Sequence, residues 1–301
     1  MIPSTLAQFD FSQPEGMSIP ASALAEGVPN RYYGSAMVAS IEHDPADLTF
    51  EEFASLNDVC FPHEPVSEAS FANRSSPHMW TVRVNGLLVG YSSMSRSSKA
   101  PHIKRIGIHP DFRSRGFAKR LMKRMLSLAA EESVCEVRLL VEQDNDAAIG
   151  LYRSFNFEVT GESVQFSSVV RSSGSEAHRA VPIDEYDWPR DRLHLPESLQ
   201  MLAKRHNPPH SLVLLFLEEE TPIGYALFCP DYPGCSPFVL LRDSVAVEQV
   251  VGLLNDYALP GKRNVKITTA DSKAIATFTQ VGTHVNYRLF EMTKRLTSSD
   301  E

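Results

Sequence analysis

Residues 106–118 contain the residue types and spacing that most clearly indicate chemistry. They read Ile106-Gly107-Ile108-His109-Pro110-Asp111-Phe112-Arg113-Ser114-Arg115-Gly116-Phe117-Ala118, a strand that stops at a proline and a turn that leads into a helix. The first backbone N–H groups of a helix lack internal partners, and the helix dipole adds partial positive charge there. Gly116 lets a diphosphate approach the backbone, and Arg113 and Arg115 can add charge-assisted hydrogen bonds. The segment therefore predicts an anion-binding site.

The basic residues of this segment also allow a different interpretation. Arg113, Arg115, Lys119, Arg120, Lys123 and Arg124 can form a solvated basic helix face or a patch for RNA. The segment matches neither G-x-x-x-x-G-K-[ST] nor G-x-G-x-x-G, so the pattern alone leaves both interpretations open. The net charge of −8 argues weakly against a nucleic-acid partner.

The elements that must position this segment follow from hydrophobic periodicity and turn signals. Strands are expected at residues 37–41, 79–84, 87–94, 102–108 and 137–141, with further strands at 157–159 and about 163–170. Asn85-Gly86 marks a tight hairpin. Helices are expected after Asp47, at about 116–131 and at 146–154. The order β-α-α-β-β-β-α-β-α-β predicts an α/β fold with a mixed sheet.

A second motif follows about 30 residues after the first: Asn145 to Tyr152, then Phe155-Asn156-Phe157. Over residues 37 to about 170, the two motifs together resemble the GNAT superfamily of N-acetyltransferases. That family has R/Q-x-x-G-x-G/A after a strand, then a helix of the type N-x-x-A-x-x-x-Y-x-x-x-G-F. Asn156 stands where the family usually has glycine, and asparagine tolerates the same left-handed backbone.

The resemblance implies that acetyl-CoA, the acyl donor, lies where the strand ending at Ile108 separates from residues 137–141. Backbone groups of Ile106 and Ile108 would pair with the pantetheine arm, while Arg113 and the amides of residues 115–119 would hold the pyrophosphate. Asn145 would bond the pantetheine or order the loop beneath it, although its position equally suits a helix N-cap. The predicted cofactor-binding residues are Ile106, Gly107, Ile108, Arg113, Ser114, Arg115, Gly116, Phe117, Ala118, Lys119 and Asn145.

The resemblance also implies direct attack of an amine on the thioester in a ternary complex. Tyr152 matches the tyrosine that commonly protonates the CoA sulfur, and its phenol is a plausible general acid. The alternative is a core aromatic with a satisfied hydroxyl. Polarisation of the carbonyl would fall to a backbone N–H near Ile108.

The general base is harder to assign. Several histone-type members have a glutamate 11 residues before the signature's first residue, and here His102 takes that position. An unperturbed imidazole pKa of about 6.5 suits a base, but a strand-end histidine without a role is the alternative. Glu64 and His63, in the loop after the first helix, and water-mediated deprotonation are further alternatives. No carboxylate lies on the strand at 102–108.

The pattern repeats after a polar linker at residues 171–176. Residues 212–217, 223–228, 265–268 and 271–278 mirror the first hairpin, the buried strand and the helix that follows it. The second copy lacks the anion site: residues 237–246 have no comparable glycine and arginines, and Phe278 replaces the tyrosine. We therefore predict an N-terminal arm at 1–36, a catalytic GNAT domain binding acetyl-CoA at 37–172 and a degenerate GNAT-like domain at 178–301.

Composition is consistent with this assignment. The 301 residues are 43% hydrophobic and 22% charged, and the longest apolar run, Leu212 to Leu217, is far shorter than the roughly 20 residues of a membrane span. The N-terminus has no export signal, and four cysteines without metal-type spacing indicate reduced thiols, a cytoplasmic protein and no metal site.

The predicted function is acetyl transfer to a primary amine of a small molecule or peptide, with no nucleic-acid or membrane partner. The missing strand carboxylate motivates an alternative, a catalytically silent acyl-CoA-binding regulator. The sequence leaves open the acceptor, the length of the acyl group and whether the chain forms a homodimer.

Overall fold

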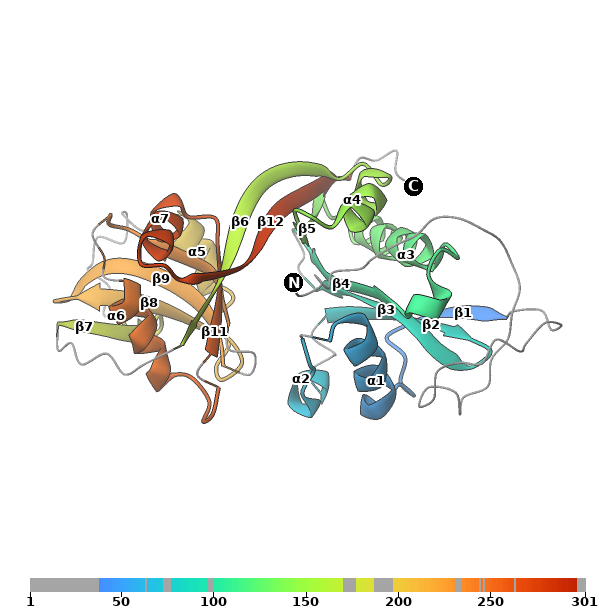
Figure 1. Ribbon diagram of the computed structural model, residues 1–301, viewed down its shortest axis with the longest axis horizontal. Coiled ribbons are helices and arrows are strands. Elements are labelled where there is room, and N and C mark those ends of the chain that lie inside the picture. Colours follow the sequence, from blue (N-terminus) through green and yellow to red (C-terminus); the bar gives the residue numbers. More distant parts are fainter. Residues whose placement is uncertain are drawn as a thin grey trace. The chain divides into compact units, whose positions relative to one another are not determined.

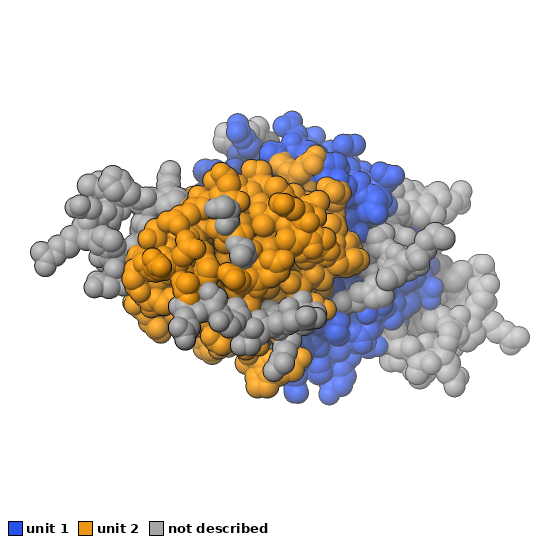
Figure 2. All heavy atoms as spheres, turned by 60° about the vertical axis from the view of Figure 1, so that its left-hand side comes forward, with its two compact units in different colours: residues 1–160, 290–301 blue, residues 161–289 orange. Residues whose placement is uncertain are grey.

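The computed structural model describes residues 38–62, 64–72, 77–96, 100–169, 177–186, 197–230, 234–243, 245, 247–262 and 264–296. The chain divides into two compact units (Figure 2). Unit 1 comprises Met1–Thr160 with Phe290–Glu301, and unit 2 comprises Gly161–Leu289. The predicted N-terminal arm at 1–36, the linker at 171–176 and the alternative base His63 lie outside the described residues.

Unit 1 is a mixed sheet covered by helices on both faces. Its strands run in the order β1-β2-β3-β4-β5-β12. Figure 1 shows α1 and α2 on one face of this sheet and α3 and α4 on the other. The elements are β1 (Ala39–His43), α1 (Phe50–Cys60), α2 (Glu68–Ala72), β2 (Pro77–Val84), β3 (Leu87–Ser95), β4 (His102–Ile108), a 3₁₀ turn (Pro110–Phe112), α3 (Phe117–Glu131), β5 (Glu136–Glu142), α4 (Asp146–Arg153), the start of β6 (Glu158–Val169) and the end of β12 (His284–Arg295).

Local sequence signals account for several element boundaries. Thr49 caps α1, because its side chain accepts a hydrogen bond from the Glu52 amide at 3.2 Å. Asn85 and Gly86 both have positive φ, 50° and 84°, as a two-residue type I′ hairpin requires. The predicted hairpin between β2 and β3 is thereby confirmed.

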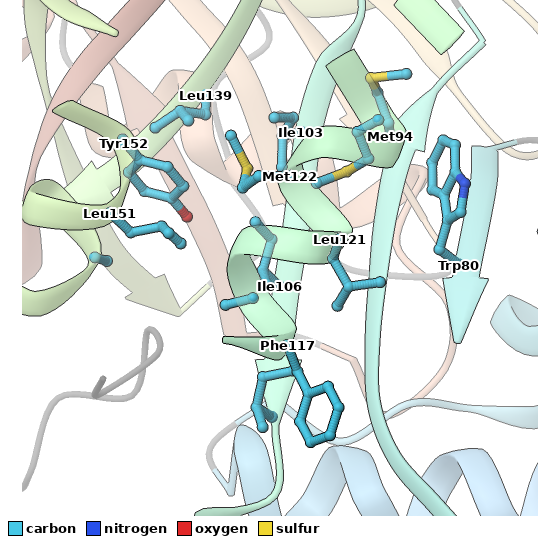
Figure 3. Close-up of a cluster of buried hydrophobic side chains, with 14 of the residues drawn as sticks. Trp80, Met94, Ile103, Ile106, Phe117, Leu121, Met122, Leu139, Leu151 and Tyr152 are labelled. Carbon is cyan, nitrogen blue, oxygen red and sulfur yellow. The ribbon is translucent and has the colours of Figure 1, made fainter. Parts of the chain in front are cut away.

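A bulge in β4 sets which side chains face which helices. The register of β4 with β3 shifts between Ser93 and Met94, so strict alternation is interrupted there. As a result, Ile103, Ile106 and Ile108 all join the core beneath α3 and α4. Without the bulge, Ile103 and Ile106 would lie on opposite faces of the sheet, because they are three residues apart. Figure 3 shows Ile103 and Ile106 beside side chains of α3. Arg105 and Gly107 consequently face α1.

Gly107 is a point of close packing between β4 and α1. A Cβ at this position would lie 2.8 Å from Phe61 Cε2 and 3.2 Å from Cys60 Sγ. Both neighbours are buried and cannot move aside easily. A glycine is therefore needed here for packing, whether or not its backbone also contacts a cofactor.

Gly107→Ala is expected to lower the free energy of unfolding by about 1–3 kcal/mol, the usual cost of overpacking. Urea denaturation measures this change. Gly150→Ala in α4 is the control, because nothing lies within 4 Å of a Cβ there. The control should leave stability unchanged or raise it by up to about 1 kcal/mol, since alanine favours helix. Equal losses in both variants would contradict the close contact at Gly107.

Unit 2 repeats the same plan, as the internal sequence repeat predicts. Its strands run in the order β6-β11-β10-β9-β8-β7. Its own core packs α6 and α7 against one set of strand side chains, and α5 covers a second set. The elements are β7 (His178–Pro182), α5 (Glu197–Ala203), β8 (Leu212–Glu218), β9 (Thr221–Cys229), β10 (Gly234–Leu240), α6 (Val247–Gly252), a 3₁₀ turn (Leu253–Asp256), β11 (Asn264–Thr269) and α7 (Ser272–Gln280).

Two long strands, β6 and β12, contribute to both units. The two strands expected at 157–159 and 163–170 are one strand, β6, whose residues 164–169 pair with β11 of unit 2. In return, residues 290–295 of β12 belong to unit 1, where the sheet order places β12 next to β5. The division at Thr160 therefore differs from the predicted domain limits of 37–172 and 178–301. Hydrophobic periodicity marks a strand but does not choose its partner, so the exchange was not predicted.

Candidate active site

The candidate site begins where β4 and β5 diverge. These parallel strands pair at His102↔Arg138 and Ile103↔Leu139, and the described register extends no further. On its other side, β4 stays paired with β3 as far as Ile108. The β5-facing edge of β4 is therefore open from the bulge to the strand end.

Backbone groups of Ile106 and Ile108 face this open edge. The His109 amide donates to the Val89 carbonyl at 2.8 Å, so residue 109 and, by alternation, residue 107 point toward β3. Ile106 and Ile108 then direct their N–H and C=O groups the opposite way. This is the orientation that pairing with an extended ligand requires, and the cofactor role of these two residues stays a prediction.

The turn after β4 forms a concave run of backbone amides at the start of α3. Ser114 and Gly116 both have positive φ, 65° and 76°, and Gly116 is the N-cap residue of α3 without a side-chain cap. A positive φ favours glycine, and nothing lies within 4 Å of a Cβ built at Gly116. The amides of Phe117 and Ala118 belong to the first helical turn, whose N–H groups have no acceptor in a preceding turn. This open, electropositive helix end can bind a phosphate group.

The side chains around this turn are partly committed to the protein itself. Arg113 Nε donates to the Ile108 carbonyl at 3.1 Å, and burial lowers the pKa of the guanidinium. Arg115 Nη2 donates to the Asp111 carbonyl at 3.1 Å, and its guanidinium lies 5.2 Å from the centre of the Phe112 ring. The two arginines therefore brace the turn. A direct contact of either with pyrophosphate stays a prediction.

Phe117 and Ala118 have buried side chains that join the core beneath α3. Their side chains are therefore committed to the core, and a contact of their backbone amides with a ligand stays a prediction. Figure 3 shows Phe117 at the end of α3 that lies near Ile106.

Asn145 is the N-cap of α4. Its Oδ1 accepts the Ala148 amide at 3.0 Å, and the residue is 7% exposed. Of the two alternatives left open by the sequence, the capping role is observed. A contact of Asn145 with a ligand stays a prediction.

Tyr152 projects from α4 into the core beneath α3. Its ring centre lies 6.0 Å from that of Phe157, and Figure 3 shows the ring beside Leu151 and Met122. Among the described residues the phenol has no hydrogen-bond partner. Burial raises the pKa of the phenol well above its ordinary value, so the group remains protonated at neutral pH. A protonated phenol is the form that a general acid needs.

His102 lies at the opposite end of β4 from the amide turn. At about 3.3 Å per residue, it is about 20 Å along the strand from Ile108. Its backbone amide donates to Ser95 Oγ at 2.7 Å, and its position coincides with the closed end of the β4–β5 divergence. The structure thus separates His102 from the turn at the start of α3, and its role as base stays a prediction.

A polar network on the α1 face was not predicted. Asn57 Oδ1 accepts hydrogen bonds from Tyr91 Oη at 2.7 Å and from Arg105 Nη1 at 2.9 Å. Arg105 also pairs with Glu64, one of the alternative bases, and Asn57 Nδ2 donates to the Glu64 carbonyl at 2.9 Å. The network fixes the loop after α1 against β4. The bulge in β4, which turns Arg105 toward α1, has no clear sequence signal.

A second missed residue is Glu142, the final residue of β5. It is 2% exposed, and its Oε2 has no hydrogen-bond partner among the described residues. Burial, and secondarily the charges of Asp144 and Glu64, raise its pKa to about 7. A sequence signal existed, because ligands of parallel strands bind outside their carboxyl ends and Glu142 occupies such an end.

His43, Asp44 and His78 gather three groups of metal-ligand type at β1 and β2. His43 Nε2 lies 3.1 Å from His78 Nδ1 and 3.4 Å from Asp44 Oδ2. Arg96 pairs with the same Asp44 oxygen, and His78 Nε2 lies 3.4 Å from Glu132. These mutual contacts account for the cluster without an ion. The expectation of no metal site remains untested.

The corresponding edge of unit 2 is closed by its own side chains. β10 and β11 pair in parallel at Gly234↔Lys266 and Cys235↔Ile267, which makes Phe238 and Leu240 the counterparts of Ile106 and Ile108. Thr269 Oγ1 donates to the Phe238 carbonyl at 2.6 Å, and the Leu240 amide approaches Asp271 Oδ1 at 3.5 Å. The Phe238 carbonyl and the Leu240 amide are thus engaged internally here, whereas at the corresponding positions of unit 1 the Ile108 carbonyl accepts from Arg113 Nε.

Unit 2 also differs at the following turn and helix. Ser244 and Ala246 of the segment predicted to lack an anion site lie outside the described residues. Phe278, the counterpart of Tyr152, is buried, and its ring stacks on Phe166 at 4.9 Å. An aromatic without a hydroxyl therefore packs well at this position of the fold.

Comparisons with known proteins identify a family to which this chain is similar. The acetyltransferase (GNAT) family matches residues 46–157. The N-alpha-acetyltransferase RimI of Mycobacterium tuberculosis is 35% identical over 122 residues, which are 38% of this chain and 73% of that protein. An acetyltransferase of Yersinia pestis is 32% identical over 83 residues, 27% of this chain; the match spans only 59% of that relative's length.

Solved structures share the fold over most of the chain. A putative acetyltransferase from Pyrococcus horikoshii superposes with a TM-score of 0.60 at 16% identity, covering 92% of this chain and 95% of that one. A tandem GNAT protein from the clavulanic acid biosynthesis pathway gives a TM-score of 0.58 at 15% identity, covering 85% and 98%. The predicted tandem α/β architecture is thereby confirmed. None of the described helices is both long and apolar enough to cross a bilayer.

Proposed function

Because this chain belongs to the GNAT family of acetyltransferases, we propose that unit 1 transfers an acetyl group from acetyl-CoA to a primary amine of a small molecule or peptide. One observation carries the proposal: α3 begins at Gly116 without a side-chain cap and with nothing within 4 Å of a Cβ built there, next to the end of β4 where its pairing with β5 has ceased. A diphosphate bound at the first feature places an extended pantetheine arm along the second.

The backbone of β4 would orient the donor. Ile106 and Ile108 present N–H and C=O groups in the direction of β5, where the described pairing has ended. Hydrogen bonds to these groups would hold the pantetheine as an added strand. A backbone N–H near Ile108 would also polarise the thioester carbonyl, because a fixed donor stabilises the negative charge that develops on oxygen.

Direct attack requires no covalent enzyme intermediate. The neutral amine nitrogen attacks the thioester carbon, the carbon–sulfur bond breaks and the sulfur takes up a proton. Tyr152 is the proposed donor of that proton, since its buried phenol stays protonated and has no partner among the described residues. Phenol donors positioned in this way typically accelerate a reaction by about 10²–10⁴-fold.

Unit 2 is proposed to support unit 1 rather than to bind a second donor. Its counterpart of the open edge is occupied by Thr269 and Asp271, and its counterpart of Tyr152 is Phe278. Each change removes one group that the proposed donor site of unit 1 would use. A single donor site per chain follows.

The function is tested by following thiol release from acetyl-CoA in the presence of a panel of primary amines and peptides. Release that depends on both acetyl-CoA and an amine is the expected result. Binding of acetyl-CoA without release across the panel would instead favour the silent regulator. Absence of acetyl-CoA binding by calorimetry would remove both interpretations.

A further inference from the structure

Glu142 is a buried carboxyl group without an evident structural purpose. Val137, Leu139 and Val141 of β5 point into the core beneath α3, so alternation turns Glu142 toward the opposite face, where α1 packs. Its Oε2 has no hydrogen-bond partner among the described residues, although such groups are normally paired. Leaving a buried polar group unpaired costs stability. A group retained at such a cost is a candidate for function.

The surroundings of Glu142 carry negative charge. Glu64, from the loop after α1, and Asp144, from the turn after β5, are the two charged groups that act on it. Glu64 is held in place by Arg105, which Asn57 also binds. Three carboxyl groups therefore lie near enough to influence one another's charge at the carboxyl end of β5.

The three carboxyl groups lie near the open β4–β5 edge, where an acceptor could meet the donor. Glu142 terminates β5 two residues before Asp144 and three before Asn145, the cap of α4, so it lies at the wide end of the divergence. The donor would occupy that divergence, as argued above. An acceptor approaching from the α1 face would then meet Glu142 and Glu64 beside the donor.

We propose that Glu142, flanked by Glu64 and Asp144, forms the acceptor site, which takes a primary alkylamine in its ammonium form, and that the Glu142 carboxylate is the general base. This inference rests on the proposed function. Glu142, on β5, replaces His102 as the assigned base and supplies a carboxylate in place of the one that β4 lacks. The motivation for a silent regulator disappears with it.

The proton balance is as follows. Glu142 removes one proton from the ammonium group and passes it to water, which leaves a neutral amine. The nitrogen lone pair forms the carbon–nitrogen bond, the carbon–sulfur bond breaks and Tyr152 protonates the departing sulfur. The nitrogen releases its second proton to solvent. A proton taken up from solvent then restores the Tyr152 phenol. The products are the N-acetylamine, CoA thiol and one net proton.

The environment of Glu142 also matches this task. A pKa of about 7 means that the group is ionised at slightly alkaline pH yet is basic enough to accept a proton. An ordinary exposed glutamate, with a pKa of about 4.3, is a much weaker base. Burial and the two neighbouring carboxylates are what raise it.

The test compares Glu142→Gln with Glu136→Gln in the full chain. Glu136 begins the same strand and pairs with Arg138, so it controls for the substitution itself. With an alkylamine, Glu142→Gln should lower kcat/KM by about 100-fold and abolish the rise in activity centred near pH 7, whereas Glu136→Gln should change neither. An aromatic amine, neutral at pH 7, needs no prior deprotonation and should lose less than about fivefold.

Stability supplies a second readout that does not depend on activity. The folded pKa of Glu142 lies above its unfolded value, so the native state binds more protons and stability falls as pH rises from about 4.5 to about 7. Glu142→Gln removes this loss. The variant should melt at a higher temperature than the parent at pH 8 and at the same temperature at pH 4.5.

The proposal is overturned if Glu142→Gln keeps alkylamine activity within twofold, if the inflection near pH 7 persists, or if alkyl and aromatic amines lose activity equally. A parent protein that releases thiol with no amine in the panel would instead contradict the proposed function. The melting comparison still reports on Glu142 in that case, and an unchanged melting temperature at pH 8 would contradict its burial as an ionised group. The two failures are therefore distinguishable.

Discussion

Gly116→Glu is expected to weaken acetyl-CoA binding by at least about 100-fold, measured by calorimetry. The substitution adds a negative charge at the amides of α3, where the pyrophosphate would bind, and repels it. Losing two charge-assisted hydrogen bonds at about 1.5–3 kcal/mol each accounts for an effect of this size. The fold should tolerate the change, because nothing lies within 4 Å of a Cβ at this position.

The matched control for this variant is Gly86→Glu. Gly86 has a similar φ of 84°, also has open space around it and lies in the β2–β3 turn. Both substitutions carry the same left-handed strain, about 1–2 kcal/mol, so both should lower the melting temperature alike. Only Gly116→Glu should lose the donor. Wild-type affinity in Gly116→Glu would contradict the phosphate-binding role of the turn.

Tyr152→Phe is expected to lower kcat by about 100-fold while changing the dissociation constant of acetyl-CoA by less than about threefold. The phenol is the proposed proton donor to the sulfur, and the ring alone supplies the packing. Since no described residue bonds the hydroxyl, its removal should leave stability nearly unchanged. Steady-state kinetics together with calorimetry separates the two effects.

Tyr225→Phe in unit 2 is the control for Tyr152→Phe. The Tyr225 hydroxyl lies 2.8 Å from Ser198 Oγ, so this variant loses a structural hydrogen bond. It should lose some stability and keep kcat. Equal losses of turnover and donor affinity in Tyr152→Phe would show that the tyrosine positions the donor rather than protonating it.

Much of the fold could be predicted because its signals are local. The Asn85-Gly86 turn requires two residues with positive φ, and the chain places the two residue types that best tolerate it there. The apolar stripe of α3 and the cap residues Asn145 and Asp271 mark helices in both copies. The tandem repeat follows from the same signals recurring in the same order.

The features that escaped prediction depend on contacts distant in sequence. The exchange of β6 and β12 is a choice of strand partner, and an alternating strand pattern fits either partner. The β4 bulge, which turns Arg105 toward α1, leaves no mark in residue type. The sequence places Glu142 at the carboxyl end of a parallel strand, but only the packing shows that it is buried and that its Oε2 has no partner among the described residues.

The shared use of β6 and β12 has a consequence for biosynthesis. Residues 290–295, which the sheet order places beside β5 in unit 1, leave the ribosome only after all of residues 161–289 have been made. At about 5–20 residues per second, the delay is on the order of ten seconds. During that interval β5 presents an unpaired edge, which favours aggregation. Chaperone demand during translation should consequently be higher for this chain than for a protein whose two lobes are assembled from separate, uninterrupted stretches.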